Sequence, residues 1–130
     1  MGYLRTAQQV APHMINQGWG RIINISGLAA RQAGTVIGSV RNVAVSAMTK
    51  NLADSLGQYG INVTVVHPGN TVTEATTPEV LARPATNVVG RMITSAEVAD
   101  VVCFLASPRS SSITGDAIVV GGGVPRAIYY

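Results

Sequence analysis

Ser26 and His67 are the polar residues with the clearest chemical potential, because each follows a short run of Ile or Val that is typical of a buried strand. The carboxyl ends of parallel strands meet at one edge of a sheet, so we expect these two side chains to be neighbours. A serine beside a histidine can act as nucleophile and base in hydrolysis. No acidic partner or oxyanion motif accompanies the pair, and a histidine that caps a strand end is the alternative interpretation.

The loop that directly follows His67 is a second candidate site. Its Pro-Gly start ends the strand, and ligands of open α/β sheets bind outside the carboxyl ends of the strands. A plain turn that leaves the strand is the alternative. The candidate ligand-binding residues of this loop are Pro68, Gly69, Asn70, Thr71, Val72 and Thr73.

The element that must position both candidates is a helix predicted over residues 38–59, between the two strands. Ser39 is the expected N-cap, and Gly57 and Gly60 supply the flexible backbone at which a helix ends. Strand, helix and strand of this length predict a right-handed βαβ crossover. Apolar residues at helical spacing predict one broad buried face, formed by Val40, Val43, Ala44, Ala47, Met48, Leu52 and Leu56.

The other segments continue the alternation of helices and strands. Residues 74–93 form an irregular stretch, which we expect to be a lid or a flexible loop with one short helix near 79–82. The order of elements predicts an α/β fold with a short parallel sheet of about three strands, flanked by helices, in one domain over residues 1–130. The predicted segments are a helix over 1–17 containing Pro12, strands over 21–26, 61–67 and 117–120, and a helix to residue 106 that a capping box at Thr94 and Glu97 introduces.

Composition excludes several classes of function. The chain of 130 residues is 47% hydrophobic and only 12% charged, and its basic residues stand singly, without the clusters and aromatic residues that bind nucleic acid. No apolar run is long enough to span a membrane, and the first residues lack a signal-like apolar core. Cys103 is the one cysteine of the chain, and we expect it to be a small buried hydrophobic residue. Because a single cysteine cannot form an internal disulfide, we expect the protein in the reducing cytoplasm.

Four segments in order resemble the second half of the short-chain dehydrogenase/reductase family: GRIINISG, AVSAMTKNLADSLGQYGINVTVVHPGNTVTE, SAEVADVVCFLAS and ITGDAIVVGGG. The resemblance implies part of a three-layer Rossmann fold and an NAD or NADP cofactor that exchanges a hydride with an alcohol or carbonyl carbon. In the family, the loop of residues 68–73 meets the nicotinamide. The family's Gly-rich cofactor loop would precede Met1, and its absence argues against cofactor binding, because a pyrophosphate needs such a loop.

The chain departs from the family at the catalytic motif Tyr-x-x-x-Lys. Alignment with the family puts Gly38 at the position of the tyrosine and Asn42 at the position of the lysine. Carbonyl reduction needs a proton donor, and a phenol with a pKa of about 10 serves only when a cation lowers that pKa. We expect no catalysis at Gly38 or Asn42, and the adjacent Arg41 is a poor acid because a guanidinium stays protonated.

The family's serine falls at Gly27, so Ser26 beside it is interpreted as a weak remnant of that site. The family's catalytic asparagine would fall before Met1. None of the four tyrosines aligns with the tyrosine of the motif. The sequence does not define whether the two tyrosines at the C-terminus reach the catalytic position. The four tyrosines are Tyr3, Tyr59, Tyr129 and Tyr130.

These features predict a truncated short-chain dehydrogenase/reductase-like protein that is impaired or inactive as an oxidoreductase on its own and persists as an associating module. The alternative is an active NAD(P)-dependent oxidoreductase of a carbonyl or alcohol substrate, completed by a partner chain. In the family the helix at 38–59 and the last strand are the usual oligomer surfaces, and the strand at 21–26 would expose an open edge. We therefore expect a homo-oligomer or a completing partner chain.

Overall fold

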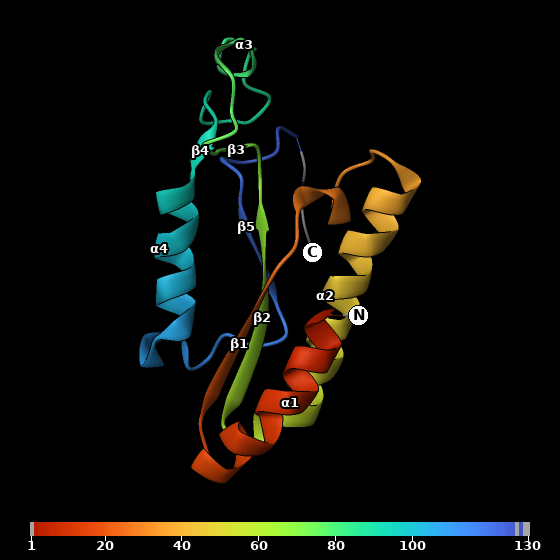
Figure 1. The fold of residues 1–130 in the computed structure, drawn as a ribbon, viewed down its shortest axis with the longest axis vertical. Helices are drawn as coiled ribbons and strands as arrows, with labels where there is room; N and C mark the ends of the chain where they lie inside the picture. Colours follow the sequence, from red (N-terminus) through yellow and green to blue (C-terminus); the bar gives the residue numbers. More distant parts are fainter. Residues whose placement is uncertain (1, 127, 129–130) are drawn as a thin grey trace.

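The computed structural model describes residues 2–126 and 128, and these form three layers (Figure 1). Helices α1 and α2 cover one face of a parallel sheet, and α4 covers the other. The predicted α/β class with a parallel sheet of three strands is confirmed. The elements are α1 (Gly2–Gln17), β1 (Gly20–Ile25), η1 (Leu28–Ala30), α2 (Val36–Leu56), η2 (Gly57–Tyr59), β2 (Ile61–Pro68), β3 (Thr71–Val72), α3 (Pro78–Leu81), β4 (Ile93–Thr94), α4 (Ser95–Ala106), η3 (Pro108–Ser110) and β5 (Ala117–Val120).

The sheet has the order β1-β2-β5, so β2 is the central strand. Ile22 of β1 lies opposite Val63 of β2, and Val65 of β2 lies opposite Ala117 of β5. Because helices cover both faces of β2, its residues from Val63 to His67 are all buried, and its sequence is largely apolar with no polar face turned to solvent. The strand therefore carries its carboxyl end, at His67 and Pro68, into the centre of the upper edge of the sheet.

Helix α2 turns a different face to the core than the sequence pattern indicated. Its buried residues are Asn42, Val45, Thr49, Ala53 and Leu56. Ala53 and Leu56 pack with Ile61 and Val63 in the main apolar cluster. Four residues of the predicted buried face, namely Val40, Val43, Ala44 and Ala47, are exposed. Apolar residues occur on both sides of this half of the helix, so helical spacing alone could not decide which side faces the sheet.

The start of α2 also differs from the prediction. The N-cap is Thr35, whose side chain accepts a hydrogen bond from the backbone N–H of Gly38 at 3.1 Å. The helix therefore begins before Ser39, and Gly38 lies inside its first turn. At the other end Gly57 is the C-cap, and Gly60 has a φ of 76° where the chain turns into β2, as the glycine positions predicted.

The segment over residues 74–93, predicted as a lid or a flexible loop, is joined to the body at both of its ends. Strand β3 pairs in parallel with β4, with Thr71 opposite Ile93 and Val72 opposite Thr94. The short helix α3 lies between them, one residue earlier than predicted. In Figure 1 this segment rises above the carboxyl ends of β2 and β5. Two-residue strands lack the length for an alternating pattern, so the sequence did not reveal this pairing.

Helix α4 begins with the predicted capping box: Thr94 accepts from the backbone N–H of Glu97, and the Glu97 carboxylate accepts from the backbone N–H of Thr94. Leu105 of this helix is buried. Cys103 is exposed, which makes the prediction of a buried cysteine wrong. It lies on α4 away from the sheet, where a small apolar residue is tolerated at the surface.

Strand β1 is an edge strand, and a hollow of about 1010 Å³ lies beside it. Apolar residues of α1, β1 and α2 form most of the walls of this hollow, among them Val10, Met14, Ile22, Val45 and Met48. The open edge of the strand that the sequence predicted is therefore present and is flanked by apolar surface. No helix among the described residues has the length and apolar character to cross a membrane.

Candidate functional site

Ser26, Gly38 and Asn42, the three residues predicted for the catalytic corner, lie together where β1 ends beside α2. The Ser26 hydroxyl donates to Oδ1 of Asn42 at 2.7 Å, and Nδ2 of Asn42 donates to the carbonyl oxygen of Gly38 at 2.7 Å. Only 8% of the Asn42 surface is exposed. The amide thus has a partner at each end and provides neither a charge nor a transferable proton.

The two glycines of this corner have little free space around them. A Cβ atom at Gly38 would lie 2.7 Å from Oγ1 of Thr35, the residue that caps α2. A Cβ atom at Gly27 would lie 3.3 Å from Oδ1 of Asn42. A side chain at position 38 would therefore displace the cap, so the present start of α2 depends on the glycine that stands where the family has tyrosine.

His67 contacts Ser46 of α2 and not Ser26, with 3.2 Å between Nε2 and the hydroxyl oxygen. Its ring is completely buried, and Nδ1 has no hydrogen-bond partner. Burial, and secondarily the positive charge of Arg31, lowers the pKa of His67. Since the Ser26 hydroxyl donates to Asn42 instead, the predicted Ser26 and His67 pair is not formed. The hydrolase interpretation fails because the parallel strands bring these residues to one edge but aim their side chains at different partners.

The loop after β2 packs against the residues that follow β5. The backbone N–H of Gly69 donates to the carbonyl oxygen of Val120 at 2.9 Å, and a Cβ atom at Gly69 would lie 2.7 Å from Cα of Gly121. The Thr71 hydroxyl donates to the carbonyl oxygen of Gly69 at 2.9 Å. This close approach of two backbones requires glycine at position 69 and fixes the direction in which the loop leaves the strand.

A hollow of about 990 Å³ lies above the carboxyl ends of the strands, between the start of α2 and the segment over residues 74–93. Of the six loop residues predicted to bind a ligand, Pro68, Gly69, Asn70 and Thr71 line this hollow, whereas Val72 and Thr73 do not. Ser26 and Asn42 line it as well. Its volume is within the range of pockets that hold small molecules and cofactors.

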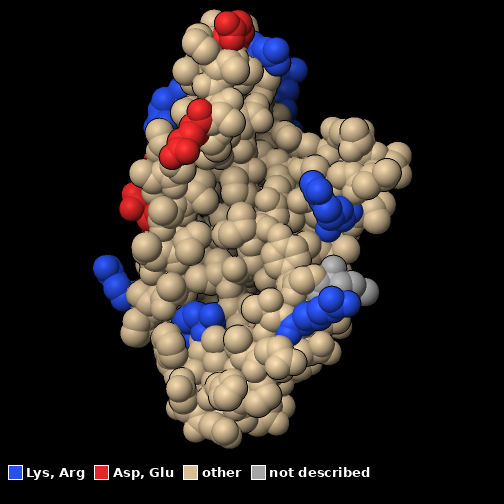
Figure 2. Space-filling view, viewed as in Figure 1, with Lys and Arg blue, Asp and Glu red and all other residues tan. Residues whose placement is uncertain are grey.

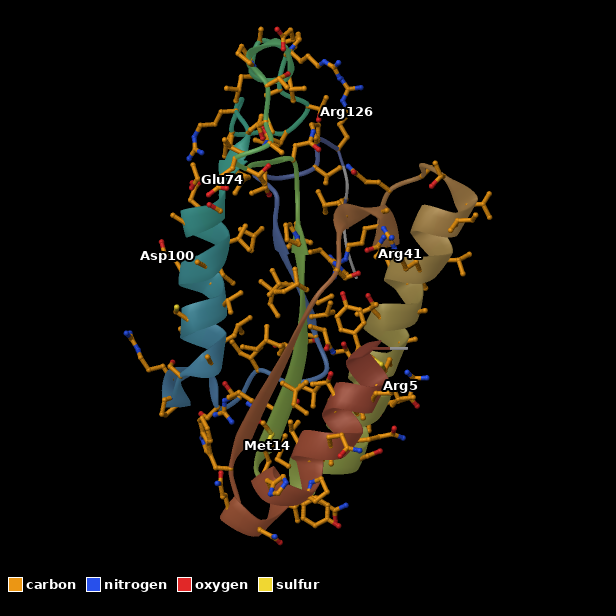
Figure 3. All side chains as sticks on the ribbon, in the orientation of Figure 1. Arg5, Met14, Arg41, Glu74, Asp100 and Arg126 are labelled. Carbon is orange, nitrogen blue, oxygen red and sulfur yellow. The ribbon has the colours of Figure 1, made fainter. Side chains whose placement is uncertain are left out.

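Arginines are the only charged side chains among the described residues that line this hollow: Arg41, Arg83 and Arg91. Figure 3 labels Arg41 near the start of α2, beside the loop that follows β1. Tyrosine, lysine, histidine, cysteine and acidic residues are all absent from this described lining. The hollow therefore has no side chain of its own that could serve as a general acid near neutral pH.

Arg91 is neutralised at the rim of the hollow. Its guanidinium makes two hydrogen bonds to the Glu97 carboxylate, at 2.9 and 2.6 Å. This pairing, together with the hydrogen bond from the backbone of Thr94, lowers the pKa of Glu97 to about 2. The same ion pair raises the pKa of Arg91. The arginines that contribute uncompensated charge to the lining are thus Arg41 and Arg83.

Several lining residues were not identified from the sequence. Arg83 and Asn87 come from the lid segment, which lies outside the four segments that resemble the family, and Gly121 comes from the turn after β5, at the end of the segment ITGDAIVVGGG. Asn87 joins the two, because its Nδ2 donates to the carbonyl oxygens of Arg91 and Gly121 at 2.7 and 3.0 Å. An asparagine that follows a proline-rich stretch was the available signal, and it is a weak one.

The tyrosines considered as substitutes do not line the hollow. The Tyr3 hydroxyl donates to the carbonyl oxygen of Ile25 at 2.6 Å, one residue from Ser26, but the ring of Tyr3 lines the apolar hollow beside β1. Tyr59 is exposed beyond the far end of α2. Tyr129 and Tyr130 lie outside the described residues. Among the described residues, no group of three or more His, Cys, Asp or Glu side chains is placed to hold a metal ion.

A family model described as enoyl-(acyl carrier protein) reductase matches residues 1–125. The short-chain reductase protein NovJ of Streptomyces niveus is 35% identical over 136 residues, which cover 95% of this chain and 52% of that protein. The chain belongs to the short-chain dehydrogenase/reductase family. The predicted resemblance to this family is thereby confirmed.

Solved structures of this family share the fold. The 3-oxoacyl-[acyl-carrier protein] reductase of Brucella melitensis with bound NAD has a TM-score of 0.85 and 34% identity, over 97% of this chain and 48% of that one. A gluconate 5-dehydrogenase from Burkholderia cenocepacia, solved with NADP and tartrate, has a TM-score of 0.87 and 29% identity, over 98% and 53%. The chain thus spans about half the length of the relatives that it matches and corresponds to a Rossmann-like portion of the family fold.

Proposed function

We propose that this chain is the nicotinamide-side half of a short-chain dehydrogenase/reductase fold, impaired or inactive as an NAD(P)-dependent oxidoreductase on its own, and that it functions by association. The observation that carries this proposal is the lining of the hollow. Asn42, which lines the hollow, stands where the family has its lysine, and Gly38, which Asn42 contacts, stands where the family has its acid. The charged residues of the described lining are all arginines. Without a proton donor, hydride arrival at a carbonyl carbon would leave an unprotonated oxygen.

The residues present suit one side of the cofactor. The loop from Pro68 to Thr71 is rigidly placed by the contact of Gly69 with Gly121 and borders the hollow, so it would hold the nicotinamide end. A bound cofactor would supply or accept the hydride. The sequence holds no G-x-G-x-x-G loop leading from a strand into a helix, so the described residues offer no cradle for the pyrophosphate. Whether NAD or NADP is used follows from residues outside this half of the fold.

The alternative function is an active oxidoreductase of a carbonyl or alcohol substrate that forms when a partner chain completes the fold. The open edge of β1 and the apolar hollow beside it favour such a partner. An added parallel strand would satisfy the unpaired backbone groups of β1 and cover the apolar walls formed by Val10, Ile22 and Met48. The partner would also have to provide the cofactor loop and a proton donor.

We further propose that a second copy of the chain covers the outer face of α2, which is the homo-oligomer expected from the sequence. Val36, Ile37 and Val40 are 80%, 82% and 65% exposed. In Figure 2 the lobe at the upper right, where the chain leads into α2, carries no charged side chain. An exposed apolar face at the start of a helix is normally covered by another surface. Two copies of α2 that cross in opposite directions at Val40 would set Val36 against Ala44 of the other copy.

Cofactor titration and light scattering test both parts of the proposal. NADH or NADPH should give weak or no fluorescence enhancement with the purified chain, while multi-angle light scattering should report a dimer or larger. In a Cys103→Ser background, Val40→Cys should form a cross-linked dimer under oxidation, and Asn51→Cys, on the polar half of the same helix, should not. Reductase turnover by the purified chain that is lost in Arg41→Ala would contradict the loss of catalysis. A monomer at all concentrations would contradict association.

A further inference from the structure

The hollow above the sheet has a one-sided charge. Arg41 enters it from α2, Arg83 from the lid segment and Arg91 from the rim, while none of the chain's six acidic residues is among its lining residues. Figure 3 shows Asp100 on α4, across the sheet from Arg41. A cavity with one sign of charge attracts ligands of the opposite sign.

Two of these three arginines are available to a ligand. Arg91 is neutralised by Glu97, as described above. Arg41 and Arg83 are exposed, and their guanidinium groups make no hydrogen bond or ion pair with the described residues. They come from different elements, Arg41 from α2 beside Asn42 and Arg83 from the segment that rises over the strand ends. Both guanidinium groups therefore contribute uncompensated positive charge to the lining of the hollow.

The rest of the lining indicates the kind of anion. Apolar surface comes from Leu28 of η1, Val80 of α3, and Met92. A planar guanidinium matches the two oxygens of a carboxylate, and each arginine carries a single charge. Two singly charged arginines beside patches of apolar surface suit a monoanion with an apolar body better than a highly charged phosphate.

We propose that this hollow binds small carboxylates with an apolar body, such as branched 2-oxo acids, and that Arg41 holds the carboxylate while Arg83 approaches it from the lid. This ligand class rests on the proposed function, since the hollow is where a nicotinamide would meet its substrate. The binding itself requires no redox step, so it is measurable on the chain as it exists.

The test uses 2-oxo-4-methylpentanoate as the probe and its uncharged methyl ester as the matched control, with binding to the full chain followed by saturation-transfer NMR and calorimetry. The oxo acid should bind at least tenfold more tightly than the ester, and Arg41→Gln should remove that preference. Arg83→Gln should weaken binding less. Arg5→Gln removes the same charge from α1, outside the hollow, and should leave the affinity unchanged. Raised salt should weaken binding of the oxo acid and not that of the ester.

Equal binding of acid and ester, or no binding of either, would overturn the inference. The same holds if Arg5→Gln weakens binding as much as Arg41→Gln, or if inorganic phosphate competes as strongly as the oxo acid. A parallel titration with NADH separates this inference from the proposed function. Oxo acid binding together with strong NADH binding would support the inference and contradict the proposed function, whereas binding of neither would refute the inference and leave the proposed function standing.

Discussion

Replacement of Asn42 by alanine tests whether the buried amide holds the catalytic corner together. The substitution removes the hydrogen bond to Gly38 and leaves the Ser26 hydroxyl without its 2.7 Å acceptor. Each lost bond costs about 1 kcal/mol, and the better helix propensity of alanine returns about 0.5 kcal/mol. We expect the free energy of unfolding to fall by about 1.5 kcal/mol, which corresponds to a midpoint lowered by about 5 °C.

The same helix offers a matched control. Asn51 donates to the carbonyl oxygen of Ala47, four residues earlier, at 2.8 Å, just as Asn42 donates to Gly38 at 2.7 Å. Asn51 is exposed, so water can form the hydrogen bond to the Ala47 carbonyl oxygen when the side chain is removed. Asn51→Ala should therefore change stability by less than about 0.5 kcal/mol. Urea unfolding followed by circular dichroism gives both values. A cycle of Ser26→Ala with Asn42→Ala should show a coupling of about 1 kcal/mol.

Equal stabilities of the Asn42→Ala and Asn51→Ala variants would refute this reasoning. Such a result would mean that the corner is solvated and that Asn42 is free to interact with a ligand. Zero coupling between Ser26 and Asn42 would lead to the same conclusion, because the two side chains would then not depend on each other. The description of a closed corner with no available proton would have to be abandoned.

Three further predictions concern the surroundings of the site. Because burial lowers the pKa of His67, the unfolded chain takes up a proton that the folded chain does not, so the urea midpoint should fall as the pH drops below about 6.5, and less steeply in His67→Gln. Gly69→Ala, whose Cβ would meet Gly121 at 2.7 Å, should cost about 1–3 kcal/mol in urea unfolding, whereas Gly34→Ala, with nothing within 4 Å, should be neutral. Thr94→Ala should lower stability by about 1 kcal/mol through loss of the capping box, and a midpoint that does not move would contradict that role.

The order of elements was predictable because each has a local sequence signature. Strand β2 is a largely apolar run, α4 begins with a capping box, and Gly60 ends η2 in the left-handed conformation. These signals depend on residues close together in the sequence. They were enough to predict the class of fold and the parallel direction of the strands.

The face of α2 was not predictable from its spacing. The helix buries Asn42 and Thr49 while exposing Val40 and Val43, because the polar pair belongs to hydrogen bonds with Ser26 and Asn24. A pattern that ranks residues by hydropathy assigns the polar side to solvent. The hydrogen-bond partners Asn24 and Ser26, which are distant in the sequence, turn the polar side of α2 toward the sheet instead.

The candidate site was predictable in part. The residues adjacent to strand ends, Ser26, Asn42 and the loop from Pro68, do border one hollow. The partner of His67 was not predictable, since two serines were available and the packing of α2 brings Ser46 to the ring. Arg83 reaches the hollow through the pairing of β3 with β4, which is too short to leave a sequence pattern.

The most direct test of the central claim is the reduction of 2,3-butanedione and 2-oxo-4-methylpentanoate, measured as loss of NADH or NADPH absorbance. The wild-type chain and a Gly38→Tyr, Asn42→Lys double variant are each assayed alone and fused behind the first half of the 3-oxoacyl-[acyl-carrier-protein] reductase FabG of Thermotoga maritima, a 35% identical relative. Circular dichroism verifies that each protein is folded. We predict turnover only in the completed double variant. Equal turnover by the completed wild-type chain would contradict the claim that this half of the fold has lost its acid.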